Sequence, residues 1–288
     1  YYIVARHGNA HIARELTVTA GKLNKQAFVR NAGRLSLTSQ LAKDSTTLKS
    51  SVRRDVYYAE LDENDKRRHL TYSTSWRAKF VLPAGAYHIV ARHGNAWTSR
   101  DITVVAGKLQ KLPFNLNGGR LVLTSALEKA AAPLKSHVRW DVYHAELDED
   151  DKRKHLTYST AWRAKFVLPA GRYYITARHG ASVRAQEFTV EPGKAVTQAV
   201  ALDAGRIKLI GRGKDGALLA RGVRWDIYAS KVSFEGKRQH ITYATGAQPI
   251  LTLSAGTYRV VLSSGKIKAA SDLVVKAGDV KEFEVAAK

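Results

Sequence analysis

The sequence contains neither cysteine nor methionine. The lack of cysteine excludes disulfide frameworks, thiolate metal sites and cysteine nucleophiles. A chain without either sulfur-containing residue offers little to oxidants, which suits an exported protein. The missing start methionine also fits a processed or partial chain.

Long apolar runs and targeting signals are missing as well. No run of 18 apolar residues occurs, so the sequence predicts no membrane-spanning helix. No charged-then-apolar start with a small-residue cleavage site marks a signal peptide. Hydrophobic residues nevertheless make up 44% of the 288 residues, enough for packed cores in two or three domains.

Carboxylates are scarce relative to cations. The chain has 25 Asp and Glu against 47 Lys and Arg, a net charge of +22. Such a surface attracts phosphate and carboxylate polymers through electrostatic steering and counterion release. The alternative is a solubilising coat on a repetitive β protein, and composition does not separate the two.

Internal repetition organises the chain. The stretch 52–94 aligns with 138–180 without a gap, and 35 of the 43 positions are identical. Residues 1–10 repeat 87–96 with a single difference. We therefore divide the sequence into a first copy, which is the C-terminal part of a partial repeat (1–32), and three complete copies. These are the second copy (33–118), the third copy (119–204) and a divergent fourth copy (205–288).

The partial first copy has two interpretations. One is that the natural protein extends upstream of Tyr1. The other is that another chain supplies the missing strands, as in strand-complementation assemblies.

Each complete copy shows the period-2 alternation of half-buried strands. In the third copy, Trp140 and Val142 alternate with Arg139 and Asp141, and turn residues such as Pro169-Ala170-Gly171 separate the runs. Helical spacing fits poorly except around 126–134. Seven short strands per copy of about 86 residues predict an all-β, Ig-like sandwich. The joints between copies are only two residues long, which favours a rod-like array over flexible beads.

A turn motif carries a resemblance to known families. The pattern Leu-Pro-Ala-Gly-Xaa-Tyr-Xaa-Ile occupies Leu82–Ile89 and Leu168–Ile175. It resembles the strand–turn–strand signature of Ig-like, transthyretin-like and carboxypeptidase-regulatory-like domains. Together with Val-Arg-Trp-Asp-Val-Tyr and the Gly-Arg-Leu opening, it is similar to repeats of large proteobacterial envelope proteins. The resemblance implies a β-sandwich array and leaves spacer, adhesin and carbohydrate-side roles open.

Alternating cations form a candidate polyanion-binding ladder. Arg77 and Lys79 alternate with apolar residues on the strand that follows Trp76, and Arg163 and Lys165 repeat this one copy later. Arg53, Arg139 and Arg224 are predicted to add to the same side, each with Asp two residues on. A basic stripe of this kind suits lipopolysaccharide phosphates, acidic polysaccharide or nucleic acid. The alternative is charge that protects sheet edges from aggregation. Gln248 and Pro249 weaken the ladder in the fourth copy.

Two other motifs invite a functional interpretation. Arg-His-Gly at 6–8, 92–94 and 178–180 suggests a metal or phosphate site. A single His per copy is a poor metal site, however. A hairpin turn with Gly at positive φ explains the motif better. The acidic loops 62–65 and 148–151 suggest Ca²⁺, although they lack an EF-hand pattern. A solvated turn, or pairing with a neighbouring copy, explains these loops equally well.

The tryptophans are predicted to be structural. Trp76, Trp140, Trp162 and Trp225 fall on the apolar phase of their strands, and Trp97 lies near a turn. Because Arg54 stands where Trp140 and Trp225 stand in the other copies, we expect that position to lie near the rim of the sandwich.

No triad spacing, phosphate loop or nucleic-acid module is present, so we expect no catalytic, cofactor or metal residues. We expect a structural or adhesive protein of a bacterial cell envelope, exported to the periplasm or cell surface, that forms a rod, fibre or lattice. Its expected partners are further copies of itself or other envelope proteins. The alternative is a polyanion-binding module for lipopolysaccharide, acidic polysaccharide or nucleic acid.

Overall fold

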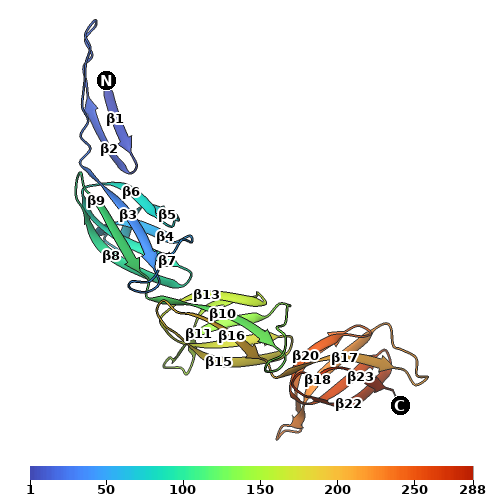
Figure 1. Ribbon diagram of the computed structural model, residues 1–288. Helices are drawn as coiled ribbons and strands as arrows, with labels where there is room; N and C mark the ends of the chain where they lie inside the picture. Colours follow the sequence, from blue (N-terminus) through green and yellow to red (C-terminus); the bar gives the residue numbers. More distant parts are fainter. Residues whose placement is uncertain (288) are drawn as a thin grey trace. The chain divides into compact units, whose positions relative to one another are not determined.

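The computed structural model describes residues 1–287 (Figure 1). The chain divides into two compact units. The first unit comprises Tyr1–Leu121, Phe166–Gly171 and Thr189–Val196, and the second comprises Val122–Lys165, Arg172–Phe188 and Thr197–Lys288. Across the described residues the secondary structure consists of 23 strands without a helix. The stretch 126–134, the one place where helical spacing fits, contains the last residue of β10 followed by bends and a turn. Division into four domains at 32, 118 and 204 stays a prediction, because the two units follow other boundaries.

The second copy is a sandwich of two sheets. Its three-stranded sheet has the order β6-β3-β9 and its four-stranded sheet the order β5-β4-β7-β8. Strand β3 pairs antiparallel with β6 and parallel with β9. The strands are β3 (Ala32–Gln40), β4 (Arg53–Leu61), β5 (Arg67–Ser73), β6 (Ala78–Pro83), β7 (Gly85–His93), β8 (Ala96–Val104) and β9 (Leu109–Asn115).

The third and fourth copies have the same seven strands in the same order. The third contains β10 (Gly118–Ala126), β11 (Arg139–Leu147), β12 (Arg153–Ser159), β13 (Arg163–Pro169), β14 (Gly171–His179), β15 (Ser182–Val190) and β16 (Ala195–Ala201). The fourth contains β17 (Ala204–Arg212), β18 (Val223–Val232), β19 (Arg238–Thr245), β20 (Ile250–Ser254), β21 (Gly256–Ser264), β22 (Ile267–Val275) and β23 (Val280–Ala286). The predicted all-β class and the seven strands per complete copy are confirmed.

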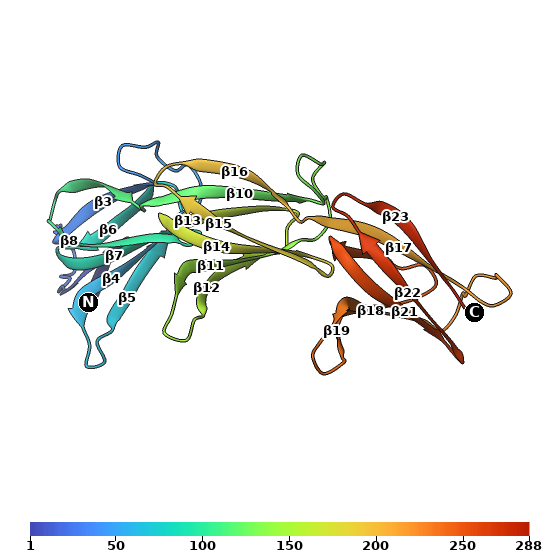
Figure 2. The same cartoon turned by 90° about the horizontal axis from the view of Figure 1, so that it is seen from below.

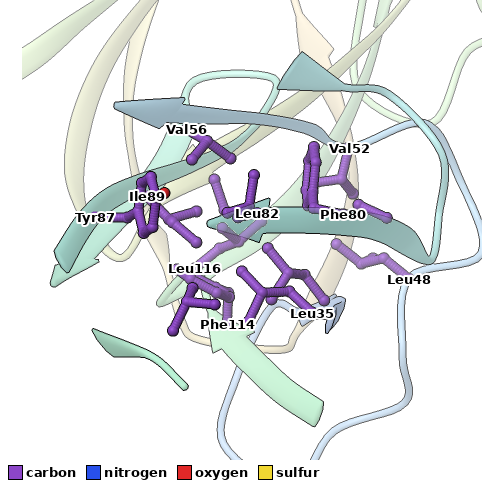
Figure 3. Packing of buried hydrophobic residues seen from close by; sticks show 14 of the residues in the cluster. Leu35, Leu48, Val52, Val56, Phe80, Leu82, Tyr87, Ile89, Phe114 and Leu116 are labelled. Atoms are coloured by element: carbon purple, nitrogen blue, oxygen red, sulfur yellow. The ribbon is translucent and has the colours of Figure 1, made fainter. Parts of the chain in front are cut away.

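Alternation along the strands builds the core. In β6, Ala78, Phe80 and Leu82 are buried while Lys79 is exposed, because successive side chains of a strand point to opposite faces. Figure 3 shows Phe80 and Leu82 among the apolar side chains of the opposing sheet, including Val56 and Ile89. Burying large aliphatic and aromatic side chains in this way stabilises each by roughly 1.5–3 kcal/mol.

The hairpins of the four-stranded sheets extend past the core. Strands β4 and β5 pair with register shifts after Val56 and again before Leu61, and the end of β4 is exposed. Figure 2 shows the loop between β4 and β5 standing clear of its sheet. Similar register shifts occur between β11 and β12 and between β18 and β19.

The first copy contributes only a hairpin, β1 (Tyr2–His7) and β2 (Ala10–Glu15). Tyr1 is 83% exposed, whereas its counterpart Tyr87 in the second copy is 2% exposed. The difference arises because, in the described chain, the β1–β2 sheet has no opposing sheet against which Tyr1 packs.

Candidate functional site

The Arg-His-Gly motif forms the turn of one hairpin in each of the first three copies. It ends β1, β7 and β14, and its glycines have φ of +60°, +60° and +59° at Gly8, Gly94 and Gly180. Glycine adopts this left-handed conformation without the steric penalty that a Cβ brings. The interpretation of the motif as a turn is confirmed.

Each of these turns is also hydrogen-bonded to the following copy. The backbone N–H after the glycine donates to a strand carbonyl: Asn9 to Val81 (3.0 Å), Asn95 to Val167 (2.9 Å) and Ala181 to Thr252 (3.0 Å). The approach is so close that a Cβ on Gly94 would lie 2.9 Å from both the Cβ and the carbonyl oxygen of Val167. Two properties of glycine are therefore needed at this position: it adopts a positive φ, and it has no Cβ to collide with Val167.

In the first unit, the linker between copies is held on both sides. The carbonyl of Asn117 accepts from Ala170 N–H, and the Gly118 N–H donates to Leu41 O, both at 2.8 Å. The Gly118 carbonyl in turn accepts from Gly193 N–H at 2.8 Å. Since every one of these groups is bonded, the linker has little freedom to bend.

The second unit contains the same arrangement one copy later. Asp203 O accepts from Ala255 N–H (2.7 Å), Ala204 N–H donates to Leu127 O (2.9 Å), and Ala204 O accepts from Gly278 N–H (2.9 Å). Asn117 and Asp203 share positive φ values of 47° and 48°. Asn and Asp are the side chains that best tolerate this conformation. We call this set of turn and linker contacts the joint.

In the second and third copies, the histidine of the motif is hydrogen-bonded within its own copy. His93 Nδ1 lies 3.0 Å from Ser51 O, and His179 Nδ1 lies 2.9 Å from His137 O. A ring nitrogen beside a carbonyl oxygen is a donor, so Nδ1 carries the proton in both rings. No group of three or more His, Cys, Asp or Glu suited to a metal ion occurs in residues 1–287.

The predicted ladder residues at β6 and β13 face outward, and Arg77 directly precedes β6. Arg77, Lys79, Arg163 and Lys165 are all exposed while their apolar neighbours are buried. In the second copy, Arg77 and Lys79 line a groove of about 340 Å³ together with Arg34 and Lys111 of the adjacent strands. The groove has four cations and no carboxylate. The equivalent face of the fourth copy carries Glu282, which pairs with Lys208 at 2.8 Å.

The expectation that Arg53, Arg139 and Arg224 share this side is wrong. Strands β4, β11 and β18 belong to the four-stranded sheets, whereas β6 and β13 belong to the three-stranded ones. These arginines are also bound to their aspartates: Arg139 Nη2 lies 2.8 Å and Arg224 Nη2 lies 2.7 Å from the carboxylate two residues on. The neighbouring aspartates largely neutralise the charge of these arginines.

A cluster that was not predicted from the sequence surrounds this ion pair in all three complete copies. In the third copy, His155 Nε2 lies 3.3 Å from Asp141 Oδ1, the Tyr143 ring packs edge-on against His155, and the Arg139 guanidinium lies 4.4 Å from the centre of the Tyr158 ring. The hydrogen bond from Arg139 holds the pKa of Asp141 below its ordinary value, against the opposing effect of burial. A constant spacing of 14 residues between Asp and His in every complete copy was the available signal.

The acidic loops form hairpin turns. Asp62 Oδ1 accepts from the backbone N–H groups of Asn64 and Lys66 at 2.9 Å, and Asp148 Oδ1 accepts from Asp150 and Lys152 in the same way. In each loop, the carboxylate of the first aspartate is therefore already used as a hydrogen-bond acceptor that stabilises the turn.

The tryptophan predictions are partly correct. Trp140 and Trp225 are fully buried, as predicted, and Trp97, near its turn, is 60% exposed. Trp76 and Trp162 are 39% and 40% exposed, because they precede β6 and β13 and so fall outside the alternation. The expectation that Arg54 lies near a rim is wrong, since it is 0% exposed.

Comparison with known proteins returns structural likeness alone. No family model and no curated protein matches this chain. Among solved structures it is similar to the Bacillus anthracis TIE protein (16% identity, 90% of this chain and 51% of that chain, TM-score 0.26) and to a streptococcal ancillary pilin (10%, 89% and 99%, 0.31). A third is GBS52, the minor pilin of Streptococcus agalactiae (14%, 59% and 94%, 0.31). The chain thus spans about half the length of the TIE protein, and at these TM-scores none of the three informs its function.

Proposed function

We propose that this chain is a non-catalytic structural array in which tandem sandwiches are fixed to one another by a repeated joint. The observation that carries the proposal is the hydrogen bond from each Arg-His-Gly turn to the following copy, made three times at 2.9–3.0 Å. A flexible string of domains needs no such bond, because a polar linker of a few residues suffices. Repeating a rigid joint gives a chain that transmits force and keeps its copies in register.

The proposal includes a setting and partners. A chain without cysteine and methionine suits an oxidising exterior, which supports an exported protein of the bacterial periplasm or cell surface, similar to proteobacterial envelope repeats. Further copies of the chain, or other envelope proteins, are the partners of such an array. The described residues contain no helix of the length and hydropathy that a membrane crossing requires.

Hydrogen exchange at the joint tests the proposal. Replacing Gly94→Ala places a Cβ against the Val167 backbone, so exchange of the Asn95 amide is expected to accelerate about tenfold or more. Gly265→Ala is the matched control, because Gly265 has φ +57° in the equivalent turn of the fourth copy and no atom within 4 Å of its Cβ position. Both variants carry the same backbone strain. If the two substitutions changed the exchange rates of their turn amides equally, the contact between the turn and the following copy would not hold the joint in place.

A second candidate function is binding of an anionic polymer to the second copy. The groove lined by Arg34, Arg77, Lys79 and Lys111 supports it, since four cations without a carboxylate attract linear anions. Lipopolysaccharide, acidic polysaccharide and nucleic acid share that chemistry. Such binding is expected to weaken with salt.

A further inference from the structure

The joint inside the second unit contains a solvent-open pocket that no role described above uses. Its volume is about 580 Å³, within the range of small-molecule sites. The third copy contributes the loop that precedes β11 and the turn after β14, while the fourth copy contributes β17 and β20. The lining residues are Pro133, Leu134, Lys135, Ser136, His179, Gly180, Arg206, Ile250, Leu251 and Thr252.

The lining is cationic on one part and apolar on another. Lys135 and Arg206 are exposed, and none of the ten lining residues is Asp or Glu. Within residues 1–287, neither cation has a carboxylate within 4.0 Å. Pro133, Leu134, Ile250 and Leu251 supply the apolar surface. A ligand that fits has an anionic group attached to a larger body.

His179 and Ser136 add further hydrogen-bonding groups to the two cations. Because His179 Nδ1 is engaged with the carbonyl of His137 at 2.9 Å, the ring orientation is fixed. Its Nε2 lies 3.5 Å from Ser136 Oγ, so two polar groups sit together among the lining residues.

The preceding joint, inside the first unit, carries the same residue types. Lys49, Ser50, His93 and Arg120 stand 86 residues before Lys135, Ser136, His179 and Arg206. The histidine is held in the same way, with Nδ1 at 3.0 Å from Ser51 O and Nε2 at 3.4 Å from Ser50 Oγ. The histidine and its two contacts thus recur at both joints, whereas the equivalent position of the fourth copy is Ser264.

We propose that this open pocket binds an organic phosphate of about monosaccharide size. Two full cations match the charge of a phosphate monoester, about −1.5 to −2 at neutral pH, better than they match a single carboxylate. Arginine offers a bidentate fork and lysine a point charge to the same oxygens. The volume exceeds that of a bare phosphate, and the aliphatic wall faces the remainder of the ligand.

The consequence is a joint that a ligand stiffens. Arg206 belongs to the fourth copy and Lys135 to the third, so a phosphate held by both stabilises the docked arrangement through linkage. This inference rests on the joint of the proposed function and adds a small-molecule control to it.

Calorimetric titration with glucose 6-phosphate tests the inference, with glucose and inorganic phosphate as comparison probes. All variants carry Arg120→Gln, so that the equivalent residues of the first unit do not contribute. Glucose 6-phosphate is expected to bind, and Lys135→Gln or Arg206→Gln is expected to weaken it by about tenfold. Lys268→Gln removes the same charge from the exposed face of β22 and is expected to leave the affinity unchanged within about twofold.

Several results would overturn the inference. They are no binding of glucose 6-phosphate at millimolar concentration, equal weakening by Lys268→Gln and Arg206→Gln, or equal affinity for inorganic phosphate. A rigid joint measured without ligand, combined with no binding, would contradict only this inference. A mobile joint would contradict the proposed function as well.

Discussion

Arg54 Nη2 donates a hydrogen bond of 2.8 Å to Ser39 Oγ inside the sandwich of the second copy. Its Nη1 donates to Ser75 O at 2.8 Å, and in the third copy Trp140 Nε1 donates to Ala161 O, which stands 86 residues later, at 3.1 Å. The guanidinium thus substitutes for an indole N–H. Burial lowers the pKa of Arg54 to about 10, so the side chain remains cationic at neutral pH, although within residues 1–287 it forms no ion pair with a carboxylate.

Restoring tryptophan is expected to stabilise the second copy. Arg54→Trp removes a buried charge and keeps the bond to Ser75 O, so the opening free energy of β4 is expected to rise by about 2 kcal/mol. Hydrogen exchange of β4 measures this copy by itself, which matters because a chain of several copies does not unfold in one step. The reciprocal Trp140→Arg is expected to destabilise β11. Destabilisation of β4 by Arg54→Trp would show that the core of the second copy has adapted to arginine.

The two serines beside this position are expected to respond with opposite signs. Ser125 Oγ is buried without a hydrogen-bond partner in the described structure, so Ser125→Ala is expected to stabilise the third copy by about 1 kcal/mol. Ser39→Ala removes the acceptor of Arg54 and is expected to destabilise the second copy by about 1–3 kcal/mol. Hydrogen exchange of β10 and β3 reports the two effects. The same sign for both would contradict this assignment.

The aspartates of the Arg–Asp–His clusters are expected to make the stability of the fold depend on pH in the acid range. The pKa values of Asp141 and Asp226 are lowered by hydrogen bonds from Arg139 and Arg224. A carboxyl group with a lowered folded-state pKa contributes stability above its unfolded value of about 3.8 and loses it as the pH falls through the folded value. Thermal unfolding between pH 5 and pH 2 is therefore expected to show a steeper decline in the parent chain than in Asp141→Asn. Parallel curves would contradict the link between this ion pair and stability.

Polymer binding is expected to map to the three-stranded sheet of the second copy. Arg77→Gln with Lys79→Gln is expected to weaken heparin binding about tenfold at low salt, because two unpaired cations leave the groove. Arg139→Gln with Arg224→Gln removes the same formal charge from the four-stranded sheets, where aspartates already neutralise it, and is expected to have little effect. Equal losses would point to net charge rather than to the groove.

The strands were predictable because alternation is a local signal. Trp140 and Val142 specify the inner face of β11 without reference to any distant residue. The burial of Arg54 was not predictable, since it depends on carbonyls at Ser75 and Trp76 that the fold brings to its guanidinium. The joint could not be predicted either, because it too depends on residues that only the fold brings together. The turn at Gly94 is recognisable in the sequence, but its contact with Val167 is not.

The distance distribution across a joint tests the central claim most directly. The chain has no cysteine, so Lys154→Cys and Gln239→Cys place two spin labels on exposed positions of the third and fourth copies inside the second unit. A fixed joint predicts one narrow distribution by double electron–electron resonance, broadened by Gly180→Val and unchanged by the matched Gly265→Val. A broad distribution in the parent chain, or one that Gly180→Val leaves unaltered, would contradict a structural array built on this joint.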